Sequence, residues 1–269
     1  MSRVTINSLE AKKQNNEKFA CVTAYDASFA KLVAAAEIET LLIGDSLGNV
    51  IHGEETTVPV TLEEMAYHVS CVARGLIGSE NHPLLIADMP FMSYTTPEHA
   101  LESAAMLMQA GAQAIKFEGG DWLLDSVHLL SERGITVCGH LGLTPQTVDS
   151  LGGFKVQGKT PEQADIILNQ AISLEQAGAR MLVVECVPTD LGKAITDALK
   201  IPVIGIGAGP YTDAQVLVMY DLLGISTGKK PRFVEDFLTE KDYGVAGALT
   251  AFRSAILSGD YPQEAHCFK

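Results

Sequence analysis

The sequence is poor in positive charge. Its 19 Lys and Arg residues stand against 33 Asp and Glu residues, which gives a formal net charge of -14. Proteins that bind nucleic acid usually carry a basic stripe, and none is found here, so we expect no nucleic-acid partner. The excess of carboxylates also disfavours binding to an anionic membrane surface.

Long hydrophobic runs and paired cysteine motifs are also missing. No run reaches the roughly 18 apolar residues that cross a bilayer, so we expect no membrane span. None of the 5 cysteines belongs to a C-x-x-C motif, which favours reduced thiols in the cytoplasm. Residues 1–19 are too polar for a secretion signal, and we therefore expect a cytoplasmic protein.

Apolar residues are plentiful, at 47% of the 269 residues, and they occur in short runs separated by helical patterns. The eight runs are residues 19–25, 40–46, 84–90, 114–120, 136–142, 181–187, 202–209 and 215–221. Nearly continuous apolar runs are typical of parallel strands covered by helices. We therefore predict an α/β protein, a single-domain (β/α)8 TIM barrel over residues 1–269, with an open doubly wound sheet as the alternative.

Helix-start patterns fall between these runs. Thr61 and Glu64 have the spacing of a capping box. Thr96-Pro97 and Thr160-Pro161 each place a proline directly after a capping threonine. These positions predict helices that begin at residues 62, 97 and 161.

Residues 143–159 break the rhythm because they show no periodicity. A segment this long without a pattern is usually a functional loop in a compact domain, and an insertion without function is the alternative. The segment follows the run that contains His140, so we expect it at the mouth of the barrel. Its glycines allow hinge motion, and Lys155 and Lys159 are its positive charges.

Polar side chains interrupt the apolar runs near their ends, where the active site of a barrel lies. They are Asp45, Ser46, Asp88, Lys116, Glu118, His140 and Glu185. A buried charge at such a position is costly unless it is paired or bound to a metal. We therefore expect these residues to share one site.

Three of the four carboxylates in this set come from successive runs. Asp45, Asp88 and Glu118 offer hard oxygen donors with no supporting cysteine, which favours Mg²⁺ as the ion they bind. The alternative for each aspartate is a cap on the helix that follows it.

Three further residues have roles in the predicted chemistry. Lys116 would neutralise a substrate carboxylate or a developing enolate, with a Schiff base or a structural ion pair as alternatives. Glu185 ends an apolar run, and burial would raise its pKa toward that of a general base, with a hydrogen-bonded structural glutamate as the alternative. His140 would orient a substrate oxygen or support a neighbour, or else be a core histidine.

A glycine-rich stretch, Gly205-Ile206-Gly207-Ala208-Gly209, would let backbone approach a ligand closely. It lacks the full G-x-G-x-x-G spacing, and no acidic residue follows at the required distance. We therefore expect no nicotinamide cofactor.

Seven segments appear together and in order between about residues 19 and 225. They read VTAYDASFAKL, LLIGDSLGNVIHG, LLIADMPF, AIKFEGG, GHLGLTPQ, VVECVP and IPVIGIGAG. This set resembles the ketopantoate hydroxymethyltransferase family, which belongs to the phosphoenolpyruvate/pyruvate barrel superfamily.

The resemblance implies transfer of a hydroxymethyl group from 5,10-methylenetetrahydrofolate to 3-methyl-2-oxobutanoate, forming 2-dehydropantoate in pantothenate and coenzyme A biosynthesis. It implies a magnesium set of Asp45, Asp88 and Glu118, and contacts to the 2-oxo acid from Asp45, Ser46, Asp88 and Lys116. Glu185 matches the proton acceptor. The resemblance also implies a homo-oligomer, a decamer.

The match departs from the family pattern after the glycine-rich stretch. Ala214 replaces an expected glycine, and Pro210-Tyr211 replaces a more polar pair, which bears on the fit of the pterin. Two other functions stay open: a lyase of the same barrel class that uses Cys138 as an acid, and a barrel that binds a ligand without catalysis.

Overall fold

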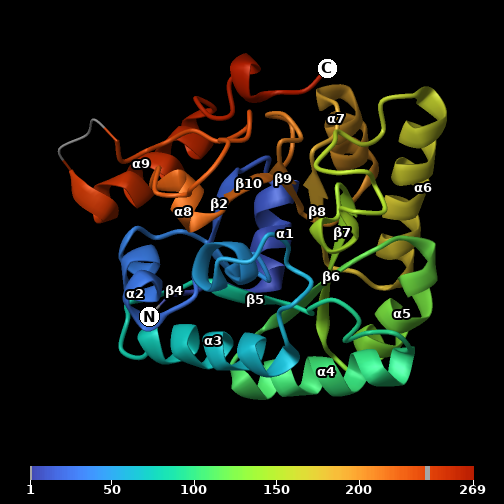
Figure 1. The fold of residues 1–269 in the computed structure, drawn as a ribbon, viewed down its shortest axis with the longest axis horizontal. Coiled ribbons are helices and arrows are strands. Elements are labelled where there is room, and N and C mark those ends of the chain that lie inside the picture. The colour runs from blue at the N-terminus through green and yellow to red at the C-terminus, as the bar shows by residue number, and fades with distance from the viewer. Residues whose placement is uncertain (1, 240–242) are drawn as a thin grey trace.

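The computed structural model describes residues 2–239 and 243–269, and its centre is a closed barrel of parallel strands (Figure 1). The barrel strands are β2 (Phe19–Thr23), β3 (Thr40–Ile43), β5 (Leu84–Asp88), β6 (Ala114–Glu118), β7 (Thr136–Gly142), β8 (Met181–Glu185), β9 (Val203–Ile206) and β10 (Ala214–Leu217). They follow in the order β10-β2-β3-β5-β6-β7-β8-β9, and β10 pairs with both β2 and β9. The predicted (β/α)8 barrel is therefore confirmed, and the open sheet is excluded.

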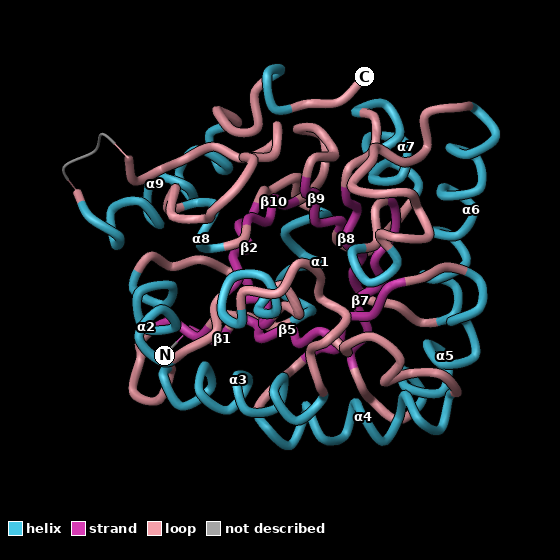
Figure 2. Tube along the Cα trace, viewed as in Figure 1, coloured by secondary structure: helices cyan, strands magenta, loops and turns pink. Residues whose placement is uncertain are grey.

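Helices surround the barrel, and Figure 2 shows them in cyan outside the magenta strands. They are α2 (Ala27–Ala35), α3 (Leu62–Gly75), α4 (Pro97–Ala110), α5 (Leu124–Glu132), α6 (Pro161–Ala177), α7 (Thr189–Ala198), α8 (Met219–Leu222) and α9 (Gly244–Ser258). The predicted starts at residues 62, 97 and 161 are all confirmed, with Thr61, Thr96 and Thr160 as the caps.

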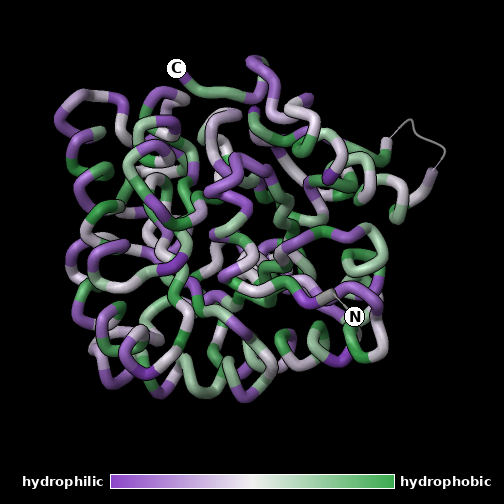
Figure 3. The backbone as a smooth tube through the Cα atoms, turned by 180° about the vertical axis from the view of Figure 1, so that it is seen from behind, coloured by the Kyte–Doolittle hydropathy of each residue, from purple (hydrophilic) through white to green (hydrophobic). Residues whose placement is uncertain are grey.

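The outer helices are amphipathic. Along α3, the side chains of Met65, Val69 and Val72 are buried at helical spacing, while Tyr67 on another face is 64% exposed. Figure 3 shows the same alternation of hydrophilic and hydrophobic residues along the helices seen from behind. Burying one face of each helix against the strands supplies most of the free energy that holds the barrel closed.

The last predicted strand, residues 215–221, is too long. β10 ends at Leu217, and α8 begins at Met219, whose backbone N–H donates to Oγ1 of Thr23 at 2.9 Å. The apolar run continues into the helix because both elements face the core, so periodicity alone does not separate them.

The remaining elements lie at the start of the chain and near α3. Helix α1 (Ile6–Gln14) precedes the barrel, and β1 (Ser2–Arg3) pairs in parallel with β4 (Asn81–His82). Leu9 of α1 is buried in a cluster with Phe19, Leu84 and Met181, which are the first residues of their strands. Helix α1 therefore covers the amino-terminal ends of the strands and leaves their carboxyl ends open.

No helix in residues 2–239 and 243–269 combines the length and the apolar character that crossing a membrane requires.

Candidate active site

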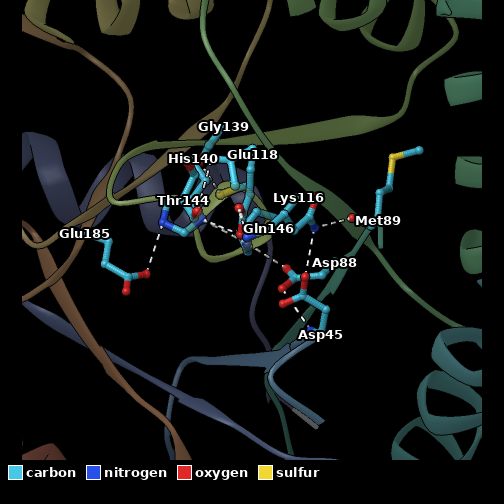
Figure 4. A network of polar contacts seen from close by, with 12 residues as sticks. Asp45, Asp88, Met89, Lys116, Glu118, Gly139, His140, Thr144, Gln146 and Glu185 are labelled. Carbon is cyan, nitrogen blue, oxygen red and sulfur yellow. Dashed lines mark hydrogen bonds and ion pairs between the residues drawn. The ribbon is translucent and has the colours of Figure 1, made fainter. Parts of the chain in front are cut away.

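The carboxyl ends of five neighbouring strands bring six predicted side chains into one network (Figure 4). These are Asp45 directly after β3, Asp88 on β5, Lys116 and Glu118 on β6, His140 on β7 and Glu185 on β8. The strand register places Asp88 beside Lys116 and Glu118 beside His140. In Figure 4 the Asp45–Asp88 pair lies on one side of His140 and Glu185 lies on the other.

Lys116 is at the centre of the network and is 3% exposed. Its Nζ lies 3.0 Å from Oδ1 of Asp88 and 3.8 Å from Oε1 of Glu118. Burial alone would lower the pKa of Lys116, but the carboxylates of Asp88 and Glu118 outweigh it and raise the pKa. The amine is therefore a protonated ammonium at neutral pH, which is a poor nucleophile.

Asp45 and Asp88 are adjacent, and both are buried. The backbone N–H of Asp45 donates to Oδ2 of Asp88 at 3.1 Å. Burial raises the pKa of the Asp45 carboxyl, and the nearby Asp88 and Glu118 charges raise it further. Asp45, Asp88 and Glu118 thus place three carboxyl groups near a single ammonium, that of Lys116.

His140 connects the two sides of the network. Its Nδ1 lies 3.2 Å from Nζ of Lys116, and its Nε2 lies 3.3 Å from Oε2 of Glu185. Burial lowers the pKa of His140, and the Lys116 charge lowers it further, so the ring is neutral at neutral pH. Nδ1 also lies 3.3 Å from Oε1 of Glu118, so the ring contacts a carboxylate on each side as well as the Lys116 ammonium.

Glu185 differs from the other carboxylates because its side chain keeps 13% exposure. Burial nevertheless raises its pKa above that of an ordinary glutamate. A partly accessible carboxylate with a raised pKa has the properties of a general base.

The backbone around Glu185 is fixed by its neighbours. Leu143 N–H donates to the Glu185 carbonyl at 2.8 Å, and a Cβ on Gly142 would lie 2.2 Å from the same oxygen. Cys186, the next residue, has a φ of 48°, which is rare for a side chain of this kind. Its carbonyl accepts from Gln157 N–H at 2.9 Å, so the segment 143–159 is tied to the strand that carries Glu185.

Ser46 lies at the edge of the network. Its Oγ is 2.9 Å from the hydroxyl of Tyr25, a residue that is only 2% exposed. Burial raises the pKa of Tyr25, so the phenol keeps its proton. Tyr25 was not predicted as a site residue, and it sets the direction of the serine hydroxyl.

Gln146 is a second residue that sequence analysis missed. It belongs to a short 3₁₀ helix, Pro145–Thr147, at the start of the segment 143–159, and is 4% exposed. Its side-chain amide donates to Oδ2 of Asp45 at 2.8 Å, and its backbone N–H donates to Oε2 of Glu118 at 3.0 Å. A polar residue in a loop is ordinary, so nothing in the local pattern marked it.

The donor chemistry of the network fits a divalent cation, although the geometry of a complete ion site is not present. Within the described part of the chain, no group of three His, Cys, Asp or Glu side chains is arranged to hold an ion. Lys116 Nζ contacts both Asp88 and Glu118, at 3.0 and 3.8 Å. Asp45 and Asp88 are the two adjacent donors, and burial, together with the Asp88 and Glu118 charges, raises the pKa of Asp45.

The glycine-rich stretch after β9 contacts protein. A Cβ on Gly205, Gly207 or Gly209 would come within 3.0 Å of Thr212, Phe233 or Thr189, respectively. Tight packing against these side chains therefore explains why glycine occupies the three positions, without any approach of the backbone to a ligand.

Cys138 is fully buried and belongs to the same buried cluster as Cys21. Burial raises its pKa to about 12. Cys138 is therefore a core residue of the barrel.

The rest of the segment 143–159 lies at the surface beside the site. Lys155 and Lys159 are exposed, and Phe154 is 70% exposed. Gly152, Gly153 and Gly158 all have positive φ, as their position in turns requires.

Comparison with known proteins identifies relatives along the whole chain. A sequence model described as ketopantoate hydroxymethyltransferase matches residues 3–264. The 3-methyl-2-oxobutanoate hydroxymethyltransferase of Marinobacter nauticus is 52% identical over 266 residues, covering 99% of each chain. The protein of the same name from Shewanella pealeana is 54% identical over 268 residues, covering 100% of each chain.

Solved structures with low sequence identity share the fold. Phosphonopyruvate hydrolase in complex with oxalate and Mg²⁺ matches with a TM-score of 0.60 at 13% identity, over 79% of this chain and 80% of that one. A 2,3-dimethylmalate lyase matches with a TM-score of 0.55 at 15% identity, over 79% of this chain and 80% of that one.

Proposed function

The chain belongs to the ketopantoate hydroxymethyltransferase family, and we propose that it carries out the reaction for which its relatives are named, hydroxymethyl transfer to 3-methyl-2-oxobutanoate. The product of that transfer is 2-dehydropantoate, and the transferred carbon comes from 5,10-methylenetetrahydrofolate. The relatives span the chain from end to end at over half identity, which supports the assignment of the activity.

The arrangement of Glu185, His140 and Lys116 is the observation that supports this chemistry. Glu185, a partly exposed base, and Lys116, a fixed ammonium, lie on opposite sides of the neutral ring of His140. A 2-oxo acid that lies across His140 would present its C3 proton to the Glu185 carboxylate and its oxygens to the Lys116 ammonium.

The residues then have distinct tasks. Lys116 and Ser46 bind and orient the carboxylate and keto oxygens of the 2-oxo acid, and Asp45 and Asp88 would contact these oxygens through the magnesium ion that they hold. Glu185 accepts the C3 proton, and Nε2 of His140 lies 3.3 Å from Oε2 of that carboxylate. Negative charge that develops on the keto oxygen is stabilised by Lys116, whose own charge exists before the reaction begins. The carbon C3 then forms a bond to the methylene carbon in an aldol-type addition. The bonds of that carbon to the two folate nitrogens break, water supplies the hydroxyl oxygen, and tetrahydrofolate leaves.

Asp45, Asp88 and Glu118 are proposed to hold magnesium. A magnesium ion bound by the substrate's oxygens would withdraw charge from the 2-oxo acid and make its C3 proton more acidic. Asp45 and Asp88 supply two adjacent donors. Glu118 would be the third donor, and its Oε2 accepts a hydrogen bond from the backbone N–H of Gln146.

The segment 143–159 is proposed as a loop that closes over folate. Its anchor on Cys186 places it next to Glu185, where the second substrate must arrive. Lys155 and Lys159 are exposed and positively charged, so they favour the anionic glutamate tail of folate.

Three broader properties are proposed on the family resemblance and the composition. We propose that residues 1–269 form one domain, that the protein works in the cytoplasm, and that it assembles as a homo-oligomer, a decamer. The mass of the assembly, measured by light scattering, tests the last of these, and a monomer would contradict it.

A lyase that uses Cys138 as its acid is not favoured. The thiol is fully buried, and burial raises its pKa to about 12.

The proposed function is tested by deuterium exchange at C3 of 3-methyl-2-oxobutanoate, followed by proton NMR. We expect exchange with enzyme and Mg²⁺ in the absence of folate, and its loss when EDTA removes the metal. Exchange that never exceeds the rate without enzyme would contradict proton removal at this site.

A further inference from the structure

The amide of Gln146 is buried among charged groups that it does not neutralise. It comes from a connecting segment, yet it reaches the interior between the ends of β3, β5 and β6. A buried amide without hydrogen-bond partners destabilises the folded state, so the contacts of this side chain must explain its position.

The two ends of the amide have different partners. Nε2 donates to Oδ2 of Asp45 at 2.8 Å and to the Met89 carbonyl at 2.9 Å, and Oε1 accepts from the hydroxyl of Tyr94. The carboxylate and the carbonyl only accept, so the amide has one satisfied orientation, with its nitrogen toward Asp45.

The backbone of the same residue holds a second carboxylate. The N–H of Gln146 donates to Oε2 of Glu118 at 3.0 Å. Pro145, directly before it in the 3₁₀ helix, restricts the turn from which both donors project. One residue therefore fixes an oxygen of Asp45, after β3, and an oxygen of Glu118, on β6.

We propose that Gln146 is a positioning residue for the divalent cation, acting through Asp45 and Glu118. By holding one oxygen of each carboxylate, it sets the direction of the other oxygen and keeps two like charges at a fixed spacing. This inference rests on the proposed function, in which Asp45, Asp88 and Glu118 hold magnesium. Hydrogen bonds that orient metal ligands in this way typically change metal affinity by about 10- to 100-fold.

The test is titration calorimetry of the purified protein with magnesium chloride alone. Gln146→Met keeps the length of the side chain and removes both of its donated hydrogen bonds, whereas Gln146→Asn keeps an amide that is too short to reach Asp45. We expect each variant to bind Mg²⁺ about 10- to 100-fold more weakly than the unmodified protein.

Thr147→Ala is the matched control. Thr147 belongs to the same 3₁₀ helix, but it is exposed and its hydroxyl contacts Thr144. Its removal should leave Mg²⁺ affinity unchanged. Raising the concentration of Mg²⁺ should restore C3 exchange in Gln146→Met, which a purely structural role would not do.

The outcomes separate this inference from the proposed function. If the unmodified protein binds no Mg²⁺, the metal in the proposed function is wrong. If it binds Mg²⁺ and both Gln146 variants bind it equally well, the proposed function stands and the positioning role is wrong. Loss of the folded structure in both variants, seen by circular dichroism in metal-free buffer, would make Gln146 a structural residue and would also overturn the inference.

Discussion

Each charged side chain at the mouth of the barrel depends on a neighbour for its state. Lys116 is protonated because carboxylates surround it, and His140 is neutral because burial and Lys116 disfavour its charged form. Glu185 has a raised pKa because it is largely buried, and it faces His140 at 3.3 Å. The environment of each residue therefore determines that Glu185 can act as the base and Lys116 as the cation.

Replacing Glu185 tests the assignment of the base. Glu185→Gln keeps the shape of the side chain but cannot accept the C3 proton. We expect the variant to bind 3-methyl-2-oxobutanoate and to exchange its C3 proton about 10²–10⁴ times more slowly. Exchange at the unmodified rate would move the base elsewhere, with His140 as the next candidate.

Lys116 offers a test between two mechanisms. Because its amine is protonated, it acts as a charge and forms no imine with the 2-oxo acid. Borohydride added with substrate should leave no adduct on the protein by mass spectrometry. A trapped adduct on Lys116 would favour a Schiff-base aldolase.

Lys116→Ala gives the kinetic counterpart. The charge is used both in binding and in the transition state, so KM should rise and kcat should fall. A rise in KM with kcat unchanged would limit Lys116 to substrate binding.

At the level of elements, the segment 143–159 combines two parts with different roles. Its first turn carries Gln146 into the site, while Lys155 and Lys159 remain exposed further along. We propose the second part as a cover for folate.

Changing Lys155 and Lys159 together to alanine tests that proposal. Exposed charge pairs contribute about 0.2–1 kcal/mol each and weaken with salt. We expect a higher KM for polyglutamylated methylenetetrahydrofolate, with C3 exchange of the 2-oxo acid nearly unchanged. An equal loss in both reactions would assign the segment to the first substrate or to folding.

The elements also show what the sequence could predict. Buried parallel strands are apolar, so a charge at the end of a run stands out, and Asp88, Glu118 and Glu185 were found in this way. Gln146 and Tyr25 were not found, because polar residues are ordinary outside strands and their burial depends on distant partners. The boundary between β10 and α8 was misplaced because both elements are buried.

At the scale of the whole molecule, the two ends of the barrel have separate tasks. The carboxyl ends of the strands carry the charged network, whereas the amino-terminal ends are filled by apolar side chains and covered by α1. Helix α1 is also held by ion pairs from Glu10 to Arg180 and from Lys13 to Asp213, with N–O distances of 2.6 and 2.7 Å. Conservative changes at this end should therefore alter stability and leave the chemistry intact.

Leu9→Ala tests this separation. Leu9 is fully buried, and its truncation leaves a cavity under the strands. We expect the free energy of unfolding to fall by about 2–5 kcal/mol, measured by denaturant titration, with kcat per folded molecule unchanged. A large loss of kcat in a fully folded sample would show that the two ends of the barrel are coupled.

The most direct test of the whole account follows the transferred carbon. The protein is incubated with 3-methyl-2-oxobutanoate, Mg²⁺ and 5,10-methylenetetrahydrofolate that carries ¹³C in its methylene group, and the products are read by carbon NMR. The account predicts 2-dehydropantoate with the label in its new hydroxymethyl carbon, formed only when Mg²⁺ is present. Absence of labelled product from the folded protein, or undiminished labelling after EDTA treatment, would contradict it.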